Sequence, residues 1–83
     1  MAEARTFILI ITQITGALFD GQVLSVTVPG TAGEMTLLPS HEPLVTTLRA
    51  GKATARTPNG ESREFELERG VMECSGNVVT VLL

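Results

Sequence analysis

Glycine and proline divide this chain at short intervals into brief runs that are rich in β-branched residues. None of the runs has the period of an amphipathic helix, and several alternate polar with apolar side chains. This pattern is typical of a β-sandwich or barrel. The predicted strands span residues 7–13, 22–28, 34–38, 44–48, 52–57, 62–68, 71–75 and 78–83. We expect an all-β fold, a two-layer antiparallel β-sandwich or flattened barrel of about eight to ten short strands.

The length of the chain, 83 residues, supplies one hydrophobic core, and we therefore expect a single domain over residues 1–83. Apolar residues make up 43% of the sequence, which is enough for a folded domain, but there is no Trp or Tyr and there are only three Phe. The core should therefore consist mainly of Val, Leu, Ile, Met and Ala. Cys74, the only cysteine, is predicted to be a small buried side chain of this core.

Two segments are apolar at successive positions. The run at residues 7–11 is far shorter than the roughly 20 residues that span a bilayer, so it predicts a buried strand and no membrane insertion. The run at residues 78–83 is apolar on both faces of its predicted strand. Because an exposed strand of this kind promotes aggregation, we expect it to lie inside the sheet or against a partner.

The predicted strands at residues 52–57 and 62–68 should form a hairpin. A two-residue loop at Asn59 and Gly60 would place Ala55 opposite Glu64 and so put a buried position on the solvent face. Shifting the pairing by one residue brings opposite charges together across the strands. We therefore expect a loop with an odd number of residues, or a bulge. The expected pairs are Arg56–Glu64, Lys52–Glu68 and Ala55–Phe65.

The sequence offers little for catalysis, nucleic-acid binding or metal binding. The formal net charge is −3, and no basic cluster is present to neutralise phosphates. Ser40, His41 and Glu42 are the residue types of a hydrolytic triad, but neighbouring side chains on an extended backbone point apart. His41 is the only histidine and Cys74 the only cysteine, which excludes the usual zinc clusters. We expect no cofactor, metal, nucleic acid or small-molecule substrate, and no catalytic activity of the chain on its own.

The sequence Pro-Gly-Thr-Ala-Gly at residues 29–33 has the glycines of a phosphate-binding loop. It lacks the Gly-Lys-Ser/Thr ending and the following helix that such a loop requires. We interpret it as a tight turn between two strands, in which glycine meets the backbone demands of the turn.

Three stretches occur in order along the chain: LFDGQV at residues 18–23, VTVPGTAGE at residues 26–34 and LLPSHEPL at residues 37–44. Together they resemble the amino-terminal β-sandwich domain of ATP synthase epsilon subunits, which has a PGTEGE-like turn and an LPGHAPL-like loop at this spacing. The resemblance extends from Leu18 to Leu83. It departs from the family at Met35-Thr36, where an apolar residue and glycine are usual, and at Ser40, where glycine is usual.

The resemblance implies a non-catalytic subunit of the central stalk, or rotor, of a rotary F-type ATP synthase. Such a subunit binds the gamma subunit and the c-ring and couples proton transport to ATP synthesis. It would lie at the cytoplasmic face of the bacterial inner membrane, as a peripheral part of F1. Most members continue into a pair of helices, whereas this sequence ends at Leu83. The expectation is therefore a short form with no carboxy-terminal helical domain and no ATP sensing by it.

Individual residues take roles from the same resemblance. Glu34 would pair with an arginine of the ring, and His41 would hydrogen-bond one of its loops; capping of local turns is the alternative for both. The residues expected near the c-ring are Thr31, Glu34, His41 and Glu42. The residues expected to form structural turns are Gly30, Gly33, Pro39, Pro43 and Gly70.

Two other functions stay open from the sequence. The first is a stand-alone β-sandwich that binds a different protein partner. The second is a small β-barrel enzyme, which would need a polar pocket that the residue inventory hardly provides.

Overall fold

The structure, a computed structural model, describes residues 5–40 and 42–83. These residues form nine strands and no helix. The strands are β1 (Phe7–Gln13), β2 (Gly16–Val23), β3 (Ser25–Gly30), β4 (Gly33–Leu37), β5 (Leu44–Leu48), β6 (Gly51–Arg56), β7 (Ser62–Leu67), β8 (Gly70–Ser75) and β9 (Val78–Leu82). The predicted all-β fold is confirmed.

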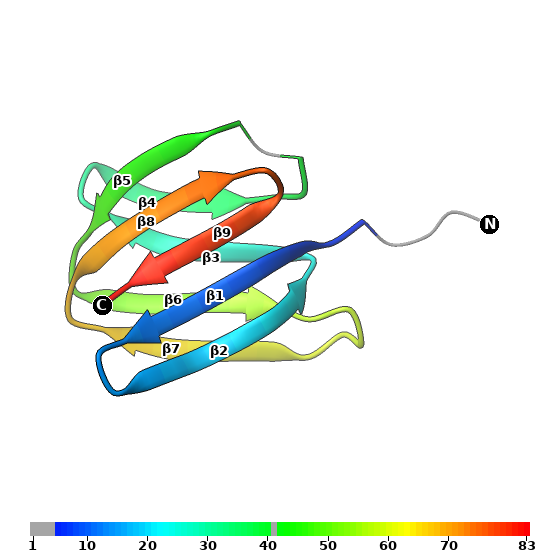
Figure 1. The fold of residues 1–83 in the computed structure, drawn as a ribbon, viewed down its shortest axis with the longest axis horizontal. Helices are drawn as coiled ribbons and strands as arrows, with labels where there is room; N and C mark the ends of the chain where they lie inside the picture. Colours follow the sequence, from blue (N-terminus) through cyan, green and yellow to red (C-terminus); the bar gives the residue numbers. More distant parts are fainter. Residues whose placement is uncertain (1–4, 41) are drawn as a thin grey trace.

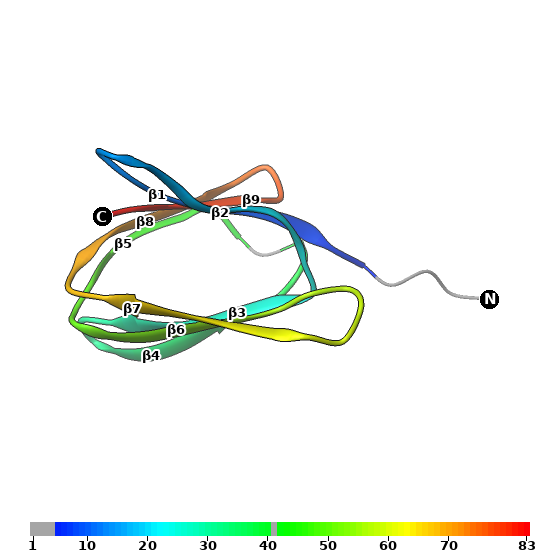
Figure 2. The ribbon, with the colours of Figure 1, turned by 90° about the horizontal axis from the view of Figure 1, so that it is seen from below.

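The nine strands belong to one strongly curled sheet that turns back on itself to give two layers (Figures 1 and 2). The five-stranded layer has the order β2-β1-β9-β8-β5 and lies nearest the viewer in Figure 1. The four-stranded layer has the order β4-β3-β6-β7. The two layers are joined where the end of β5 meets β3, at the pair Gly30 and Leu48. The predicted two-layer sandwich is therefore confirmed.

The core lies between the layers and follows from strict alternation along the strands. In β1, Phe7, Leu9 and Ile11 are at most 1% exposed, and the intervening side chains point outward. The described residues include no buried polar or charged side chain. The core is aliphatic apart from Phe7, as the sequence predicts, and Cys74 is buried within it. Each fully buried aliphatic side chain contributes about 1.5–3 kcal/mol relative to an exposed one.

The loop of the β6–β7 hairpin has an odd number of residues, as predicted, but the residues paired across the two strands differ from the predicted ones. Ala53 pairs with Phe65 and Ala55 pairs with Arg63, so the predicted pairs Arg56–Glu64, Lys52–Glu68 and Ala55–Phe65 are wrong by two residues. The odd-numbered connection is confirmed, because β6 ends at residue 56 and β7 begins at residue 62. The faces are consequently as predicted, with Ala53 and Ala55 buried.

Local hydrogen bonds within the loop decide this register. The Thr57 N–H donates to the Glu61 carbonyl at 2.9 Å, and the Gly60 N–H donates to the Thr57 carbonyl at 3.0 Å. The Asn59 side-chain oxygen accepts from the Thr57 hydroxyl and from the Glu61 N–H. Gly60 has φ of +90°, a conformation that L side chains rarely adopt. These contacts place the turn at residues 58–60, one residue earlier than the expected pairs require.

The predicted strand at residues 22–28 is wrong, because it spans the end of β2 and most of β3. The chain bends at Leu24, whose N–H donates to the Arg56 carbonyl at 2.7 Å and so begins the second layer. The earlier part of β2 is missing from the prediction. This edge strand does not alternate cleanly, and its register with β1 shifts between Ile11 and Thr12.

The apolar strand β9 lies inside the sheet, between β1 and β8, which confirms one of its two expected positions. It runs antiparallel to β8 but parallel to β1, with Ile8 opposite Val78 and Ile10 opposite Thr80. All other strand pairs in the sheet are antiparallel, so the sheet is mixed and the predicted antiparallel arrangement holds for every pair except β1–β9. The β1–β9 pair joins segments near the two ends of the chain, so no local pattern could reveal it.

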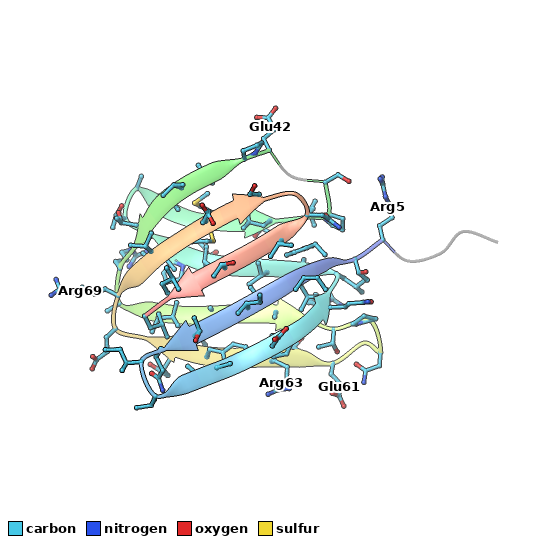
Figure 3. The ribbon with its side chains drawn as sticks, in the orientation of Figure 1. Arg5, Glu42, Glu61, Arg63 and Arg69 are labelled. Atoms are coloured by element: carbon cyan, nitrogen blue, oxygen red, sulfur yellow. The ribbon has the colours of Figure 1, made fainter. Side chains whose placement is uncertain are left out.

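An aromatic pair closes the side of the sandwich where the two ends of the curled sheet, β2 and β7, approach each other. Phe19 and Phe65 meet edge to face, with ring centroids 5.6 Å apart. The Arg63 guanidinium lies 5.4 Å from the Phe19 centroid and 5.7 Å from the Phe65 centroid, and Figure 3 shows Arg63 on this side of the molecule. These contacts hold the two layers together where no backbone hydrogen bonds link them.

Candidate functional site

The described part of the chain holds no site with the features of an enzyme centre. A hollow of about 240 Å³ opens to the surface and is lined by Gln13, Ile14, Thr15 and Leu83, none of which has a titratable side chain. Among residues 5–40 and 42–83, no three His, Cys, Asp or Glu side chains gather in a way that would hold a metal ion. No helix in this part of the chain is long and apolar enough to cross a membrane.

The outer face of the four-stranded layer is polar. Lys52, Arg56, Glu64 and Glu66 are exposed on β6 and β7, and Lys52 forms an ion pair of 3.4 Å with Glu64. Beside them, the hydroxyls of Thr27 and Thr36 lie 2.9 Å apart across β3 and β4. Mixed charges and hydroxyl groups of this kind are typical of a surface that stays in water.

The outer face of the five-stranded layer is different, because it carries six aliphatic side chains among mostly uncharged polar ones. Outward-pointing residues alternate with buried ones such as Leu9 and Ile11 in β1 and Met72 and Cys74 in β8. We call this surface the apolar face. Its aliphatic residues are Ile8 and Ile10 from β1, Val45 from β5, Val71 from β8, and Val78 and Leu82 from β9.

The strand pairing makes the apolar face continuous. Ile8 lies opposite Val78, and Val71 lies opposite Leu82. Val45, Leu82 and Val71 are 67%, 52% and 40% exposed, so nothing in the described part of the chain covers them. A contiguous exposed apolar patch on a sheet is the common mark of a protein-binding surface. The arrangement is therefore suited to contact with a partner.

Two of the residues assigned to the c-ring lie together in the β3–β4 hairpin. Thr31 is in the turn, where its hydroxyl lies 3.0 Å from that of Thr47 and its N–H donates to the Thr47 carbonyl. Glu34 follows in β4, opposite Pro29, and is exposed. No ion pair or hydrogen bond within the described residues involves the Glu34 carboxylate.

The other two assigned residues belong to the connection between β4 and β5. Glu42 is exposed just before β5 and projects from the edge of the molecule in Figure 3. It lies at the opposite end of β4 from Thr31, so the structure does not bring these two residues together at one end of the sandwich. The turn that holds Thr31 precedes β4, and Glu42 follows β4 in the connection to β5. His41 lies outside the described residues.

Two of the predicted turn residues, Gly30 at the end of β3 and Gly70 at the start of β8, occupy close-packed positions. A Cβ atom on Gly30 would lie 2.7 Å from the Gly33 carbonyl oxygen, and one on Gly70 would collide with the Leu82 carbonyl oxygen. Gly33 has φ of +138°, which disfavours any other residue. Pro39 begins a turn after β4, and Pro43 directly precedes β5.

Sequence reasoning missed Asn77, which organises the end of the sandwich next to the β4–β5 connection. Its side-chain oxygen accepts from the Ser40 N–H at 3.1 Å, and its side-chain nitrogen donates to the Thr6 carbonyl at 2.9 Å. The available signal was the Gly76-Asn77 dipeptide, which predicts a turn but says nothing of its distant partners.

The fold defines a two-layer β-sandwich domain whose five-stranded layer leaves aliphatic side chains exposed. Residues 6–83 match the β-sandwich domain family of the ATP synthase delta/epsilon chain. The chain is 42% identical over 65 residues to the ATP synthase epsilon chain of Stenotrophomonas maltophilia strain K279a, which covers 78% of this chain. It is 38% identical over 66 residues to that of Xanthomonas euvesicatoria, covering 80% of this chain. The chain therefore belongs to the ATP synthase delta/epsilon β-sandwich family, and the resemblance seen in the sequence is confirmed.

The matched region is only part of these relatives. It covers 46% of the Stenotrophomonas chain and 47% of the Xanthomonas chain, so this chain spans about half the length of the relatives it matches. The fold agrees with a chain in the Euglena gracilis mitochondrial ATP synthase, with a TM-score of 0.87 at 23% identity over 99% of this chain and 52% of that one. It also agrees with a chain in the structure of the Tetrahymena thermophila mitochondrial ATP synthase central stalk and c-ring. That match has a TM-score of 0.77 at 12% sequence identity and covers 98% of this chain and 65% of the other.

Proposed function

We propose that this domain is a non-catalytic part of the central stalk of a rotary F-type ATP synthase, where it couples proton transport to ATP synthesis. Family membership supports this proposal, since the matched relatives are ATP synthase epsilon chains. The work of such a domain is mechanical: it holds neighbouring rotor parts in fixed positions. A closely packed core suits this work because interiors of that density deform little under load.

The observation that carries the proposal is the contrast between the two outer faces. The outer face of the four-stranded layer is polar, with Lys52, Glu64 and Glu66 on it, whereas a larger exposed apolar patch commonly marks a site of protein contact. The five-stranded layer instead exposes Val45, Val71 and its aliphatic neighbours. We assign the gamma subunit to this apolar face.

The c-ring is the second proposed partner, along β4. Thr31 and Glu34 lie at one end of β4 and Glu42 lies beyond its other end, so a partner surface that meets all three would extend along β4. Glu34 and Glu42 are exposed, and the Glu34 carboxylate has no ion-pair partner among the described residues. We place the assembled domain as a peripheral part of F1 at the cytoplasmic face of a bacterial inner membrane.

The test is binding to the purified gamma subunit of the same synthase. The variant Val45→Lys with Val71→Lys puts two charges on the apolar face without touching the core. We expect wild type to bind gamma and this variant to lose most of its affinity, because each buried unpaired charge opposes association. The variant Ser62→Lys, on the outer face of β7, is the control and should bind normally. A wild-type chain that stays monomeric beside gamma would contradict the proposal.

A further inference from the structure

Among the described residues, the apolar face carries charge at two places, and both charges are negative. Asp20 in β2 lies opposite Ile10, Ile10 lies opposite Thr80, and Thr80 lies opposite Glu73 in β8. These four residues therefore form one row across four adjacent strands, with their side chains on the same outer face. Strand spacing puts the backbone positions of Asp20 and Glu73 about 14 Å apart, with one aliphatic and one hydroxyl side chain between them.

Neither carboxylate is neutralised within the described part of the chain. Asp20 and Glu73 are both exposed, and no ion pair joins either of them to another described residue. The five strands of this layer contain no Lys or Arg at all. The opposite outer face differs, because there Lys52 and Glu64 neutralise each other.

Covering the face without supplying cations would leave both carboxylates at a dehydrated interface. The loss of hydration opposes binding unless each charge gains a cationic, hydrogen-bonded partner. A second copy of this chain, docked face to face, would bring further carboxylates together with aliphatic and uncharged polar groups, but no Lys or Arg from these five strands. The charge pattern thus favours a different protein that carries positive charge, and it disfavours self-association.

We propose that the apolar face selects a partner segment with an aliphatic stripe flanked by two Lys or Arg side chains, one for Asp20 and one for Glu73. On an α-helix that crosses the strands, their separation corresponds to about two to three turns. This inference rests on the proposed function, in which the gamma subunit supplies that segment. Asp20 and Glu73 set the orientation of the partner and speed its association, while the aliphatic residues provide most of the buried area.

The experiment measures the affinity of the purified gamma subunit for the chain at about 50 and 200 mM salt, where screening of exposed charges differs. The variant Asp20→Asn with Glu73→Gln removes both charges at nearly constant shape. The control, Glu61→Gln with Glu66→Gln, removes the same charge from exposed sites outside the apolar face. Thermal unfolding of each variant verifies that the fold is retained.

We expect the Asp20/Glu73 variant to bind about tenfold or more weakly at low salt and to lose most of the salt dependence. The control should stay within about twofold of wild type at both salt concentrations. If the Asp20/Glu73 variant bound gamma as tightly as wild type and with the same salt dependence, this inference would be overturned and the proposed function would stand. Absence of wild-type binding at either salt concentration would overturn both.

Discussion

The backbone N–H of Ser40 donates a hydrogen bond to the side-chain oxygen of Asn77 at 3.1 Å, although the two residues are 37 positions apart. Both have φ of +63° and so adopt the left-handed conformation. The Asn77 amide also donates to the Thr6 carbonyl. One side chain in the β8–β9 turn thereby fixes the β4–β5 connection and the start of β1, next to the proposed c-ring residue Glu42.

Replacing Asn77 should loosen this end of the sandwich. Asn77→Ala removes both side-chain hydrogen bonds and places a residue less suited than asparagine in the left-handed conformation, so we expect a loss of about 1–2 kcal/mol in unfolding free energy. Urea denaturation measures this change, and amide exchange at Ser40 should become faster. Asn77→Gly is the matched variant, because it removes the same bonds without conformational strain. Unchanged exchange at Ser40 in both variants would show that the two bonds do not hold the loop.

Ser40 is one of two non-glycine residues with a positive φ in the described part of the chain. A residue with a Cβ atom is strained at φ of +63°, whereas glycine is not. We expect Ser40→Gly to be about 1 kcal/mol more stable than Ser40→Ala, after both have lost the contact between the hydroxyl and Arg5. Thermal or urea unfolding of the pair measures the difference. Equal stability would mean that this backbone conformation is not maintained in solution.

Cys74 makes stability depend on pH at the alkaline end. Burial, followed by the nearby negative charge of Glu73, raises the pKa of its thiol above the ordinary value of 9.0. The folded state thus keeps the thiol proton at a pH where the unfolded chain begins to lose it. The contribution of the protonated Cys74 thiol to the unfolding free energy is complete below about pH 9. It is lost as the pH rises through the pKa of this thiol in the folded state.

The prediction is measured as the unfolding free energy of wild type minus that of Cys74→Ala between about pH 7 and pH 10. The subtraction cancels the effect that titration of all other groups has on the unfolding free energy. We expect a constant difference up to about pH 9 and a fall above it. A difference that rises with pH would contradict the direction of the pKa shift.

Glu34→Arg tests the proposed contact with the c-ring. Glu34 is exposed on β4, so the substitution should leave the domain folded. Charge reversal would turn an exposed attraction of about 0.2–1 kcal/mol into a repulsion of similar size. We expect less proton pumping per ATP hydrolysed in membrane vesicles that carry the complete synthase. Glu66→Arg, an exposed strand residue distant from β4 in the same layer, is the control, and an equal effect of both variants would argue against a specific contact.

How far the sequence predicts this fold depends on whether a feature is local. Alternation assigns Ala53, Ala55 and Leu67 to the core correctly, because a period of two residues is visible within a single strand. The partners in the β6–β7 hairpin are wrong because the side chains of Thr57 and Asn59 fix the turn, and charge pairing contributes too little to move it.

Features that join distant parts of the chain are harder to predict. The parallel pairing of β1 with β9 and the bonds made by Asn77 have no local signature. The apolar face could be predicted only in part. The sequence shows that the strand at residues 78–83 is apolar on both sides, but it does not show that one of these sides stays uncovered. Which of two apolar sides becomes the core is decided by packing of the whole sheet.

The most direct test of the proposed docking face compares the labelling rates of two introduced cysteines with a maleimide reagent, with and without the gamma subunit. Val71→Cys lies on the apolar face and Ser62→Cys on the opposite face, both in a Cys74→Ala background. We expect gamma to slow labelling at position 71 by about tenfold or more, and to leave position 62 unchanged, because a buried thiol is shielded from the reagent. Equal labelling of position 71 with and without bound gamma, or protection of position 62 instead, would contradict the assignment.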